Sequence, residues 1–179
     1  INEKARIIHF LGGWGGLRSP RCAGCRKFAA VAGPRRDGEF AARCLAEAKK
    51  LQWNIGANAW DGHWYRRAYF DNGEPLGSAT NEECQIDSLP QSWSVISGAG
   101  KPERAREAME AVATHLVRHE AKLIQLFDPP FDKSALNQAY ITRYIPGLRG
   151  TVIQYTHAPT ATPRPFPHAV HNTRTWNLF

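Results

Sequence analysis

The chain has 179 residues, with 23 Lys/Arg and 16 Asp/Glu giving a formal net charge of +7 at pH 7. This length suits one domain with a buried core. No apolar run approaches the roughly 18 residues that cross a bilayer, and the first residues lack a signal-peptide pattern, so we expect a cytoplasmic protein. The basic residues accompany no nucleic-acid-binding motif, which argues against a nucleic-acid partner.

The four cysteines include one Cys-x-x-Cys pair. A structural zinc site needs a second close cysteine pair or a histidine pair at matching spacing, and neither is present. We therefore expect no metal and reduced thiols. The cysteines are Cys22, Cys25, Cys44 and Cys84.

Residues 1–35 show neither helical nor strand periodicity. Glycine and proline interrupt the segment GGLRSPRCAGCRKFAAVAGPRR throughout. Such interruptions are typical of irregular chain. We therefore predict an irregular N-terminal segment.

Residues 37–55 are predicted to form a helix, because apolar residues recur there at three- and four-residue spacing. Gly56 is expected to end it. The apolar face consists of Phe40, Cys44, Ala48, Leu51 and Ile55.

The stretch 60–87 combines aromatic, carboxylate and turn-forming residues. We expect a long loop over one end of the helices that contains the only strands, as a short pair around 64–70 followed by a turn at 71–73. Aromatic faces beside carboxylates suit a site that binds sugar rings. The alternative is a packed loop without a ligand, since most aromatic clusters serve packing.

Two further helices are predicted at 88–98 and 102–118. Ser88 can cap the first, with Gln91 reaching back to the helix start. A short glycine turn joins the two in an αα-hairpin, the repeating unit of an α/α barrel. The second helix carries one apolar stripe of Ala105, Ala108, Met109, Val112, Leu116 and Val117. Beyond it, the four prolines within 158–171 exclude a regular helix.

Seven short motifs follow one another in fixed order with almost no gaps. They are Trp60-Asp61-Gly62, Trp64-Tyr65-Arg66-Arg67-Ala68-Tyr69, Gly77-Ser78, Asn81-Glu82-Glu83-Cys84, Ile86-Asp87-Ser88, Gln91-Ser92-Trp93 and Ile96-Ser97-Gly98. Together they resemble glycoside hydrolase family 94, which contains inverting phosphorylases of cellobiose, chitobiose and β-1,2-glucans. Within the family, the resemblance is closest to the phosphorylase-like domain of cyclic β-1,2-glucan synthases.

The resemblance implies a mainly α fold. The family's catalytic domain is an (α/α)6 barrel much longer than this chain, so we expect a partial barrel with αα-hairpins over 36–157. An irregular segment, 1–35, would precede it and a Pro-rich segment, 158–179, would follow. A partial barrel would leave apolar helix faces exposed.

In an inverting phosphorylase, phosphate is the nucleophile and a single acid protonates the leaving oxygen. The family's acid lies in an Asp-Trp-Asn-Asp motif that this sequence lacks, so we expect a truncated domain that is inactive alone. The resemblance also implies that Tyr144 and Arg149 contact the acceptor sugar and that His157 binds phosphate. Trp60 and Trp64 are further candidates for sugar contact. Phosphate would be a co-substrate, with no organic cofactor, and the substrate a β-linked gluco-oligosaccharide, above all β-1,2-glucan.

One loop departs from the family pattern. Between Arg149 and Gln154 the family has Glu-Asn-Gly-Gly, whereas this chain has Gly150-Thr151-Val152-Ile153. Because β-branched residues replace two flexible glycines, we expect the loop before His157 to follow a different path.

Two alternatives remain open. Glu82, Glu83 and Asp87 could supply the acid and base of a hydrolase, although loop carboxylates more often cap helices and pin turns. The chain could also be a sugar- or partner-binding helical module without catalysis. It would then bind the remainder of a barrel or form an oligomer.

Overall fold

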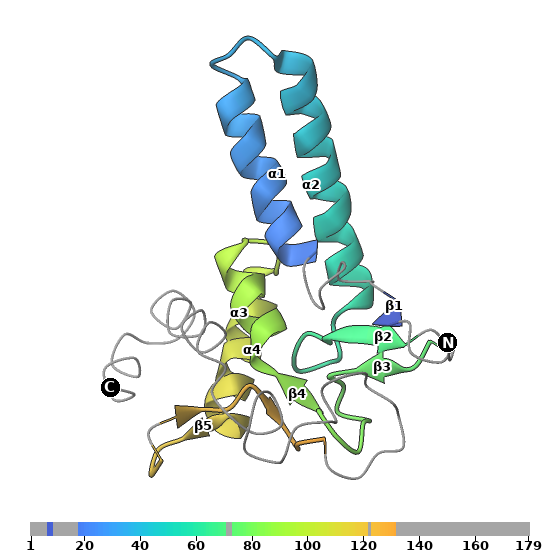
Figure 1. Cartoon of the computed structure of the whole chain (residues 1–179), viewed down its shortest axis with the longest axis vertical. Coiled ribbons are helices and arrows are strands. Elements are labelled where there is room, and N and C mark those ends of the chain that lie inside the picture. The colour runs from blue at the N-terminus through green and yellow to red at the C-terminus, as the bar shows by residue number, and fades with distance from the viewer. Residues whose placement is uncertain (1–6, 9–17, 71–72, 122, 132–179) are drawn as a thin grey trace.

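In the computed structural model, residues 7–8, 18–70, 73–121 and 123–131 are described. This part is mainly helical and contains two helical hairpins, one of which projects from the rest (Figure 1). The predicted mainly α class with αα-hairpins is confirmed, and the arrangement is compatible with part of a helical barrel. The helices are α1 (Arg18–Ala32), α2 (Gly38–Asn58), α3 (Ser88–Ile96) and α4 (Pro102–His115).

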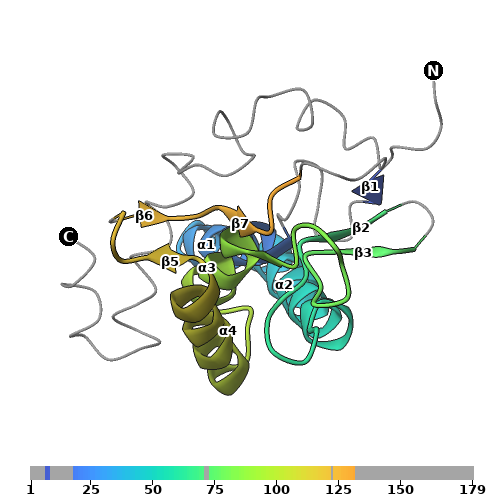
Figure 2. The ribbon, with the colours of Figure 1, turned by 90° about the horizontal axis from the view of Figure 1, so that it is seen from below.

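The described strands are short and form three small antiparallel sheets. The first has the order β1-β2-β3, the second pairs β4 with β7 and the third pairs β5 with β6. The β2–β3 and β5–β6 pairs lie at opposite ends of the molecule (Figure 2). The strands are β1 (Ile7–Ile8), β2 (Ala68–Phe70), β3 (Pro75–Leu76), β4 (Ile86–Asp87), β5 (Val117–Arg118), β6 (Leu123–Ile124) and β7 (Phe127–Asp128).

The predicted pair near 64–70 is present as the β2–β3 hairpin, with Tyr69 opposite Pro75. The expectation that the loop 60–87 holds the only strands is wrong, because β1, β5, β6 and β7 lie outside it. Strands β5 and β6 are neighbours in sequence and pair with each other, whereas β1 and β7 gain their hydrogen-bond partners from distant segments. Asp87, for example, pairs with Phe127, and alternation within two residues cannot reveal such a partner.

The prediction that residues 1–35 are irregular is wrong for 18–32, which form α1. Proline in the first helical turn costs little, because the amide it lacks has no partner within the helix. One interior glycine, Gly24, costs only about 1 kcal/mol relative to alanine. Packing against α2 offsets this cost through a buried stripe of Cys22, Ala29 and Ala32.

Helix α2 begins where the sequence predicts and extends three residues further than the predicted end at Ile55. The Asp37 side chain caps it by accepting a hydrogen bond from the Phe40 amide at 3.1 Å. Gly56 lies inside the helix, so its predicted role as terminator is wrong. Arg104 of α4 donates to the Gly56 carbonyl oxygen at 2.8 Å, which satisfies one carbonyl of the last turn.

Helices α3 and α4 form the predicted αα-hairpin. The capping residue of α3 is Asp87, one residue before the predicted Ser88, and its side chain accepts from the Leu89 amide at 2.8 Å. In the connecting turn, Gly98 has φ +62°, a conformation that favours glycine. The predicted helix 102–118 is too long at its end, because α4 stops at His115 and residues 117–118 form β5. The predicted apolar stripe is still buried, with four residues in α4 and two just beyond it: Ala105, Ala108, Met109, Val112, Leu116 and Val117.

Two buried clusters hold these elements together. The larger joins α1, α2 and α4 to Trp64 and Tyr65 of the loop. The smaller lies between the β2–β3 hairpin and the segment around Phe127. Six large apolar side chains are exposed among the described residues, and all but Ile96 belong to α1 and α2: Phe28, Val31, Phe40, Leu45 and Trp53.

Candidate functional site

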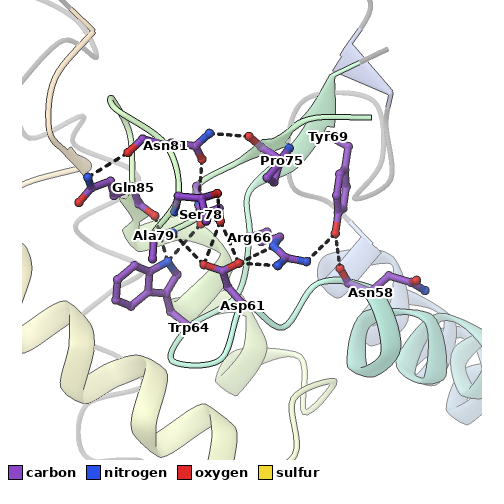
Figure 3. Close-up of polar contacts among 12 residues, drawn as sticks. Asn58, Asp61, Trp64, Arg66, Tyr69, Pro75, Ser78, Ala79, Asn81 and Gln85 are labelled. Atoms are coloured by element: carbon purple, nitrogen blue, oxygen red, sulfur yellow. Dashed lines mark hydrogen bonds and ion pairs between the residues drawn. The ribbon is translucent and has the colours of Figure 1, made fainter. Parts of the chain in front are cut away.

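The Asp61 carboxylate is the centre of a polar network in the loop after α2 (Figure 3). It accepts from Arg66 Nε at 2.6 Å and Nη2 at 2.5 Å, and from Ser78 Oγ at 2.9 and 3.1 Å. The Ala79 amide donates to Asp61 Oδ2 at 2.8 Å. The side chain is only 4% exposed. Asp61 is therefore a buried carboxylate with both oxygens satisfied, which makes it a structural anchor.

Arg66 connects this network to the end of α2. Its Nη1 donates to the Tyr69 hydroxyl at 2.8 Å, and that hydroxyl donates to the Asn58 carbonyl oxygen at 2.6 Å. Burial alone would lower the pKa of Arg66, but its bonds to Tyr69 and Asp61 outweigh burial and raise it. The guanidinium therefore stays charged and ties the start of the loop to its β2 strand.

The adjacent Arg67 binds a second buried carboxylate, Asp87, the cap of α3. Burial raises the pKa of Asp87, while the Arg67 guanidinium and the Leu89 amide oppose that rise. The two neighbouring arginines thus bind two different carboxylates, one in the loop and one at a helix start. Both ion pairs hold the framework together.

A tight turn follows β3 and places Ser78 against Asp61. Gly77 has φ +79°, and a Cβ there would lie 2.8 Å from the Arg67 amide nitrogen. The Ser78 amide donates to Asn81 Oδ1 at 2.8 Å, and Asn81 Nδ2 donates to the Pro75 carbonyl oxygen at 2.8 Å. Because of this backbone angle and this close approach, only glycine fits at position 77.

Trp64 packs inside this framework. It is 8% exposed, and its indole nitrogen donates to the carbonyl oxygens of Gln85 at 2.9 Å and Gly77 at 3.2 Å. Its ring meets that of His115 edge-on, with centroids 5.5 Å apart. The contacts assign Trp64 a packing role, and its predicted contact with sugar stays a prediction.

Trp60 is the more accessible of the two predicted tryptophans and is half-buried. The Tyr65 ring meets it edge-on with centroids 5.0 Å apart. The Arg104 guanidinium carbon lies 5.0 Å from the Trp60 ring centroid, a cation–π distance. Only part of the Trp60 ring is therefore free to meet a ligand, and its predicted sugar contact also stays a prediction.

The other predicted site residues divide into two groups. Tyr144, Arg149 and His157, together with the altered loop before His157, lie outside the described residues. The second group is the three carboxylates of the hydrolase alternative, which differ in exposure: Glu82 is exposed, whereas Glu83 and Asp87 are buried. With Asp87 held by Arg67, the structure does not present the three carboxylates on one surface.

The framework consists of Asp61, Arg66, Arg67, Ser78 and Gln91. Only Gln91 had a predicted role, that of reaching back to the helix start, and its Nε2 donates to the Asp87 carbonyl oxygen there. The available signal was their position within the family-like motifs, where polar residues alternate with aromatic ones. In the described ranges, no group of three or more His, Cys, Asp or Glu side chains is arranged to hold a metal ion. None of the helices there is long and apolar enough to cross a membrane.

Comparison with known proteins gives a family for this framework. Residues 22–164 match the catalytic domain of the glycosyl hydrolase 94 superfamily. A cyclic beta-(1,2)-glucan synthase from Rhizobium meliloti is 40% identical over 154 residues, covering 86% of this chain and 5% of that protein. A solabiose phosphorylase from Paenibacillus borealis is 34% identical over 125 residues, covering 70% of this chain and 16% of that protein.

A cellobionic acid phosphorylase from Neurospora crassa is 33% identical over 107 residues, which cover 59% of this chain and 13% of that protein. The chain thus spans a small part of the length of each of these three relatives. The match includes α1 to α4 almost completely and all of the Asp61 framework. The chain therefore belongs to the glycosyl hydrolase 94 superfamily and matches its catalytic domain.

Proposed function

We propose that this chain forms part of a domain that processes β-linked glucans by phosphorolysis or the reverse glycosyl transfer. Family membership supports this reaction class, since relatives include phosphorylases and a cyclic beta-(1,2)-glucan synthase. The greater identity to the synthase favours a β-1,2-linked gluco-oligosaccharide as the sugar substrate. Inorganic phosphate is the proposed co-substrate.

The observation that carries this proposal is the rigid framework around Asp61. A sugar site needs its contact residues held within a fraction of an ångström, and buried hydrogen-bonded supports provide this. Here the two arginine–carboxylate pairs fix the loop that contains Trp60. The framework supports a binding surface and does not itself supply a reacting group.

The proposed contacts with ligand lie further along the chain. Tyr144 and Arg149 would bind the acceptor sugar through stacking and hydrogen bonds, and His157 would donate to a phosphate oxygen. The carboxylates of Asp61 and Asp87 are held in ion pairs, so neither is placed to protonate a leaving oxygen. We therefore propose that the isolated chain binds sugar without measurable turnover. Without a general acid, the rate loses a factor of about 10²–10⁴.

Binding can be tested by calorimetric titration of the chain with β-1,2-linked gluco-oligosaccharides, using β-1,4-linked ones as the linkage comparison. Trp60→Ala should weaken binding at least several-fold. Trp53→Ala is the matched control, because Trp53 is 71% exposed on α2 and lies outside the framework loop. Equal binding of both linkages would remove the β-1,2 preference. No binding of either would contradict the sugar-site proposal.

Turnover is tested separately, by phosphate release from glucose 1-phosphate with glucose or sophorose as acceptor. We expect none from the isolated chain. Turnover that is lost in His157→Ala and kept in His119→Ala would show that the chain contains an acid that we have not identified. Sugar binding without turnover also fits the non-catalytic module. The effect of phosphate on sugar affinity then distinguishes this module from a phosphorylase-type site. A phosphate-dependent gain in sugar affinity that His157→Ala abolishes supports the phosphorylase-type site.

A further inference from the structure

Helices α1 and α2 run antiparallel in the projecting hairpin (Figure 1), and one contact between them sets their register. Cys22 Sγ donates to the Ala48 carbonyl oxygen at 3.5 Å. Both residues are buried, with Cys22 fully inaccessible. Position 22 of α1 therefore lies opposite position 48 of α2.

This register places Cys25 opposite Cys44. Cys25 lies three residues beyond Cys22 toward the hairpin turn, and Cys44 lies four residues from Ala48 toward the same turn. Because an α-helix rises about 1.5 Å per residue, the two displacements agree to within about 1.5 Å. Spacings of three and four residues keep each cysteine on the face of its predecessor. The two facing stripes thus carry a cysteine each at one level.

The packing between the helices favours a close approach at this level. The buried residues that flank the cysteine pair are small, Ala29 and Ala32 on α1 and Ala48 on α2. Small side chains bring helix axes to the short end of the usual range of about 8–10 Å. A disulfide needs Cα atoms about 4.4–6.8 Å apart, which facing positions on closely packed helices can provide.

We propose that Cys25 and Cys44 are a thiol-modification site that forms a reversible disulfide across the α1–α2 hairpin. Both are free and partly exposed, whereas Cys22 and Cys84 are buried. The co-substrate class is a small anionic disulfide such as glutathione disulfide. Two exposed basic residues within two positions of the cysteines, Lys27 and Arg43, would attract it.

The reaction is two successive exchanges. The thiolate of one cysteine attacks a sulfur of glutathione disulfide, forming a mixed disulfide and releasing one glutathione thiolate. The second cysteine thiolate then attacks the protein sulfur of that mixed disulfide and releases the second glutathione. Two protein thiols are oxidised to one disulfide, and one glutathione disulfide is reduced to two thiols.

Peptide mapping tests this inference on the whole chain. After incubation with glutathione disulfide and alkylation of free thiols, trypsin releases CAGCR (residues 22–26) and CLAEAK (residues 44–49). We expect these peptides joined, with a mass two hydrogens below their sum plus one alkyl group on Cys22. The link should persist in Cys22→Ser and disappear in Cys25→Ser and in Cys44→Ser. Oxidation should raise Tm by about 5–10 °C, reversibly with dithiothreitol.

Three results would overturn the inference. A link that persists in Cys25→Ser and disappears in Cys22→Ser would show a different register. A disulfide within CAGCR would assign reactivity to the Cys-x-x-Cys pair alone. Recovery of four alkylated cysteines would show no reaction. The same oxidation in concentrated urea is the folding control, since links to Cys84 should then appear as well.

Discussion

Gln91 binds both backbone groups of Tyr65 through its side-chain amide. The Tyr65 amide donates to Gln91 Oε1 at 2.8 Å, and Gln91 Nε2 donates to the Tyr65 carbonyl oxygen at 2.9 Å. Nε2 also donates to the Asp87 carbonyl oxygen at 2.7 Å. Because Gln91 is fully buried, a single side chain of α3 holds the loop as a neighbouring strand would.

Replacement of Gln91 by leucine should therefore strongly destabilise the fold. The change leaves the buried amide and carbonyl of Tyr65 without partners, and each such loss costs about 1–3 kcal/mol. We expect the free energy of unfolding to fall by about 3 kcal/mol in urea titration. Gln125→Leu is the control, since Gln125 is also buried and its Oε1 has no partner among the described residues. Equal losses in the two variants would contradict a special role for Gln91.

The Asp61 pair provides a second stability prediction. Asp61→Asn removes the negative charge that pairs with Arg66, whose side chain is 27% exposed. Breaking a buried pair by removing one partner typically costs about 3–5 kcal/mol, and the partial exposure of Arg66 places our expectation at the lower end. The exposed Glu82→Gln should change stability by less than about 0.5 kcal/mol. A melting temperature for Asp61→Asn close to that of Glu82→Gln would argue against the network as the framework's centre.

Two glycines with similar backbone angles separate strain from steric overlap. Gly73 has φ +85° and open space where a methyl side chain would lie, whereas Gly77 has φ +79° and a Cβ there would lie 2.8 Å from the Arg67 amide nitrogen. Gly73→Ala should cost about 1 kcal/mol from the backbone conformation alone. Gly77→Ala should cost at least twice as much, because the backbone at Arg67, just before β2, must also move. Chemical denaturation of both variants measures the two losses. A loss for Gly73→Ala that equals or exceeds that for Gly77→Ala would contradict the steric argument.

The buried thiol of Cys84 predicts lability at alkaline pH. Burial, with the nearby Asp87, raises the pKa of Cys84 well above its ordinary value of 9.0. Above pH 9.0 the unfolded chain therefore loses a proton that the folded chain retains, so the free energy of unfolding falls as pH rises. Burial raises the pKa of Cys22 and Tyr65 too, which acts in the same direction.

The urea midpoint should therefore decline between about pH 8.5 and about pH 10.5, and Cys84→Ala should reduce the slope of that decline. Cys44→Ala is the matched control, because Cys44 is only half-buried. The comparison uses slopes, since Cys84 has φ +50° and any substitution there changes the absolute stability. Identical slopes in wild type and Cys84→Ala would assign the lability to other groups.

Local patterns in the sequence were sufficient for several elements. The stripe from Ala105 to Val112 predicted α4 because burial of one helix face leaves a 3.6-residue period in the sequence. The glycine turn at Gly98 predicted the α3–α4 hairpin, since few other residues adopt a positive φ there. The motifs from Trp60 to Gly98 indicated the family without coordinates, and the family comparison confirmed it.

Tertiary contacts decided what those patterns missed. Helix α1 forms despite Gly24 because its small residues pack along α2, and α2 continues through Gly56 because Arg104 binds that carbonyl from α4. The packing of Trp64 depends on the carbonyl oxygens of Gly77 and Gln85, to which its indole nitrogen donates. In each case the deciding partner is distant in sequence, and local propensity is too weak to outweigh burial and hydrogen bonding supplied by another segment.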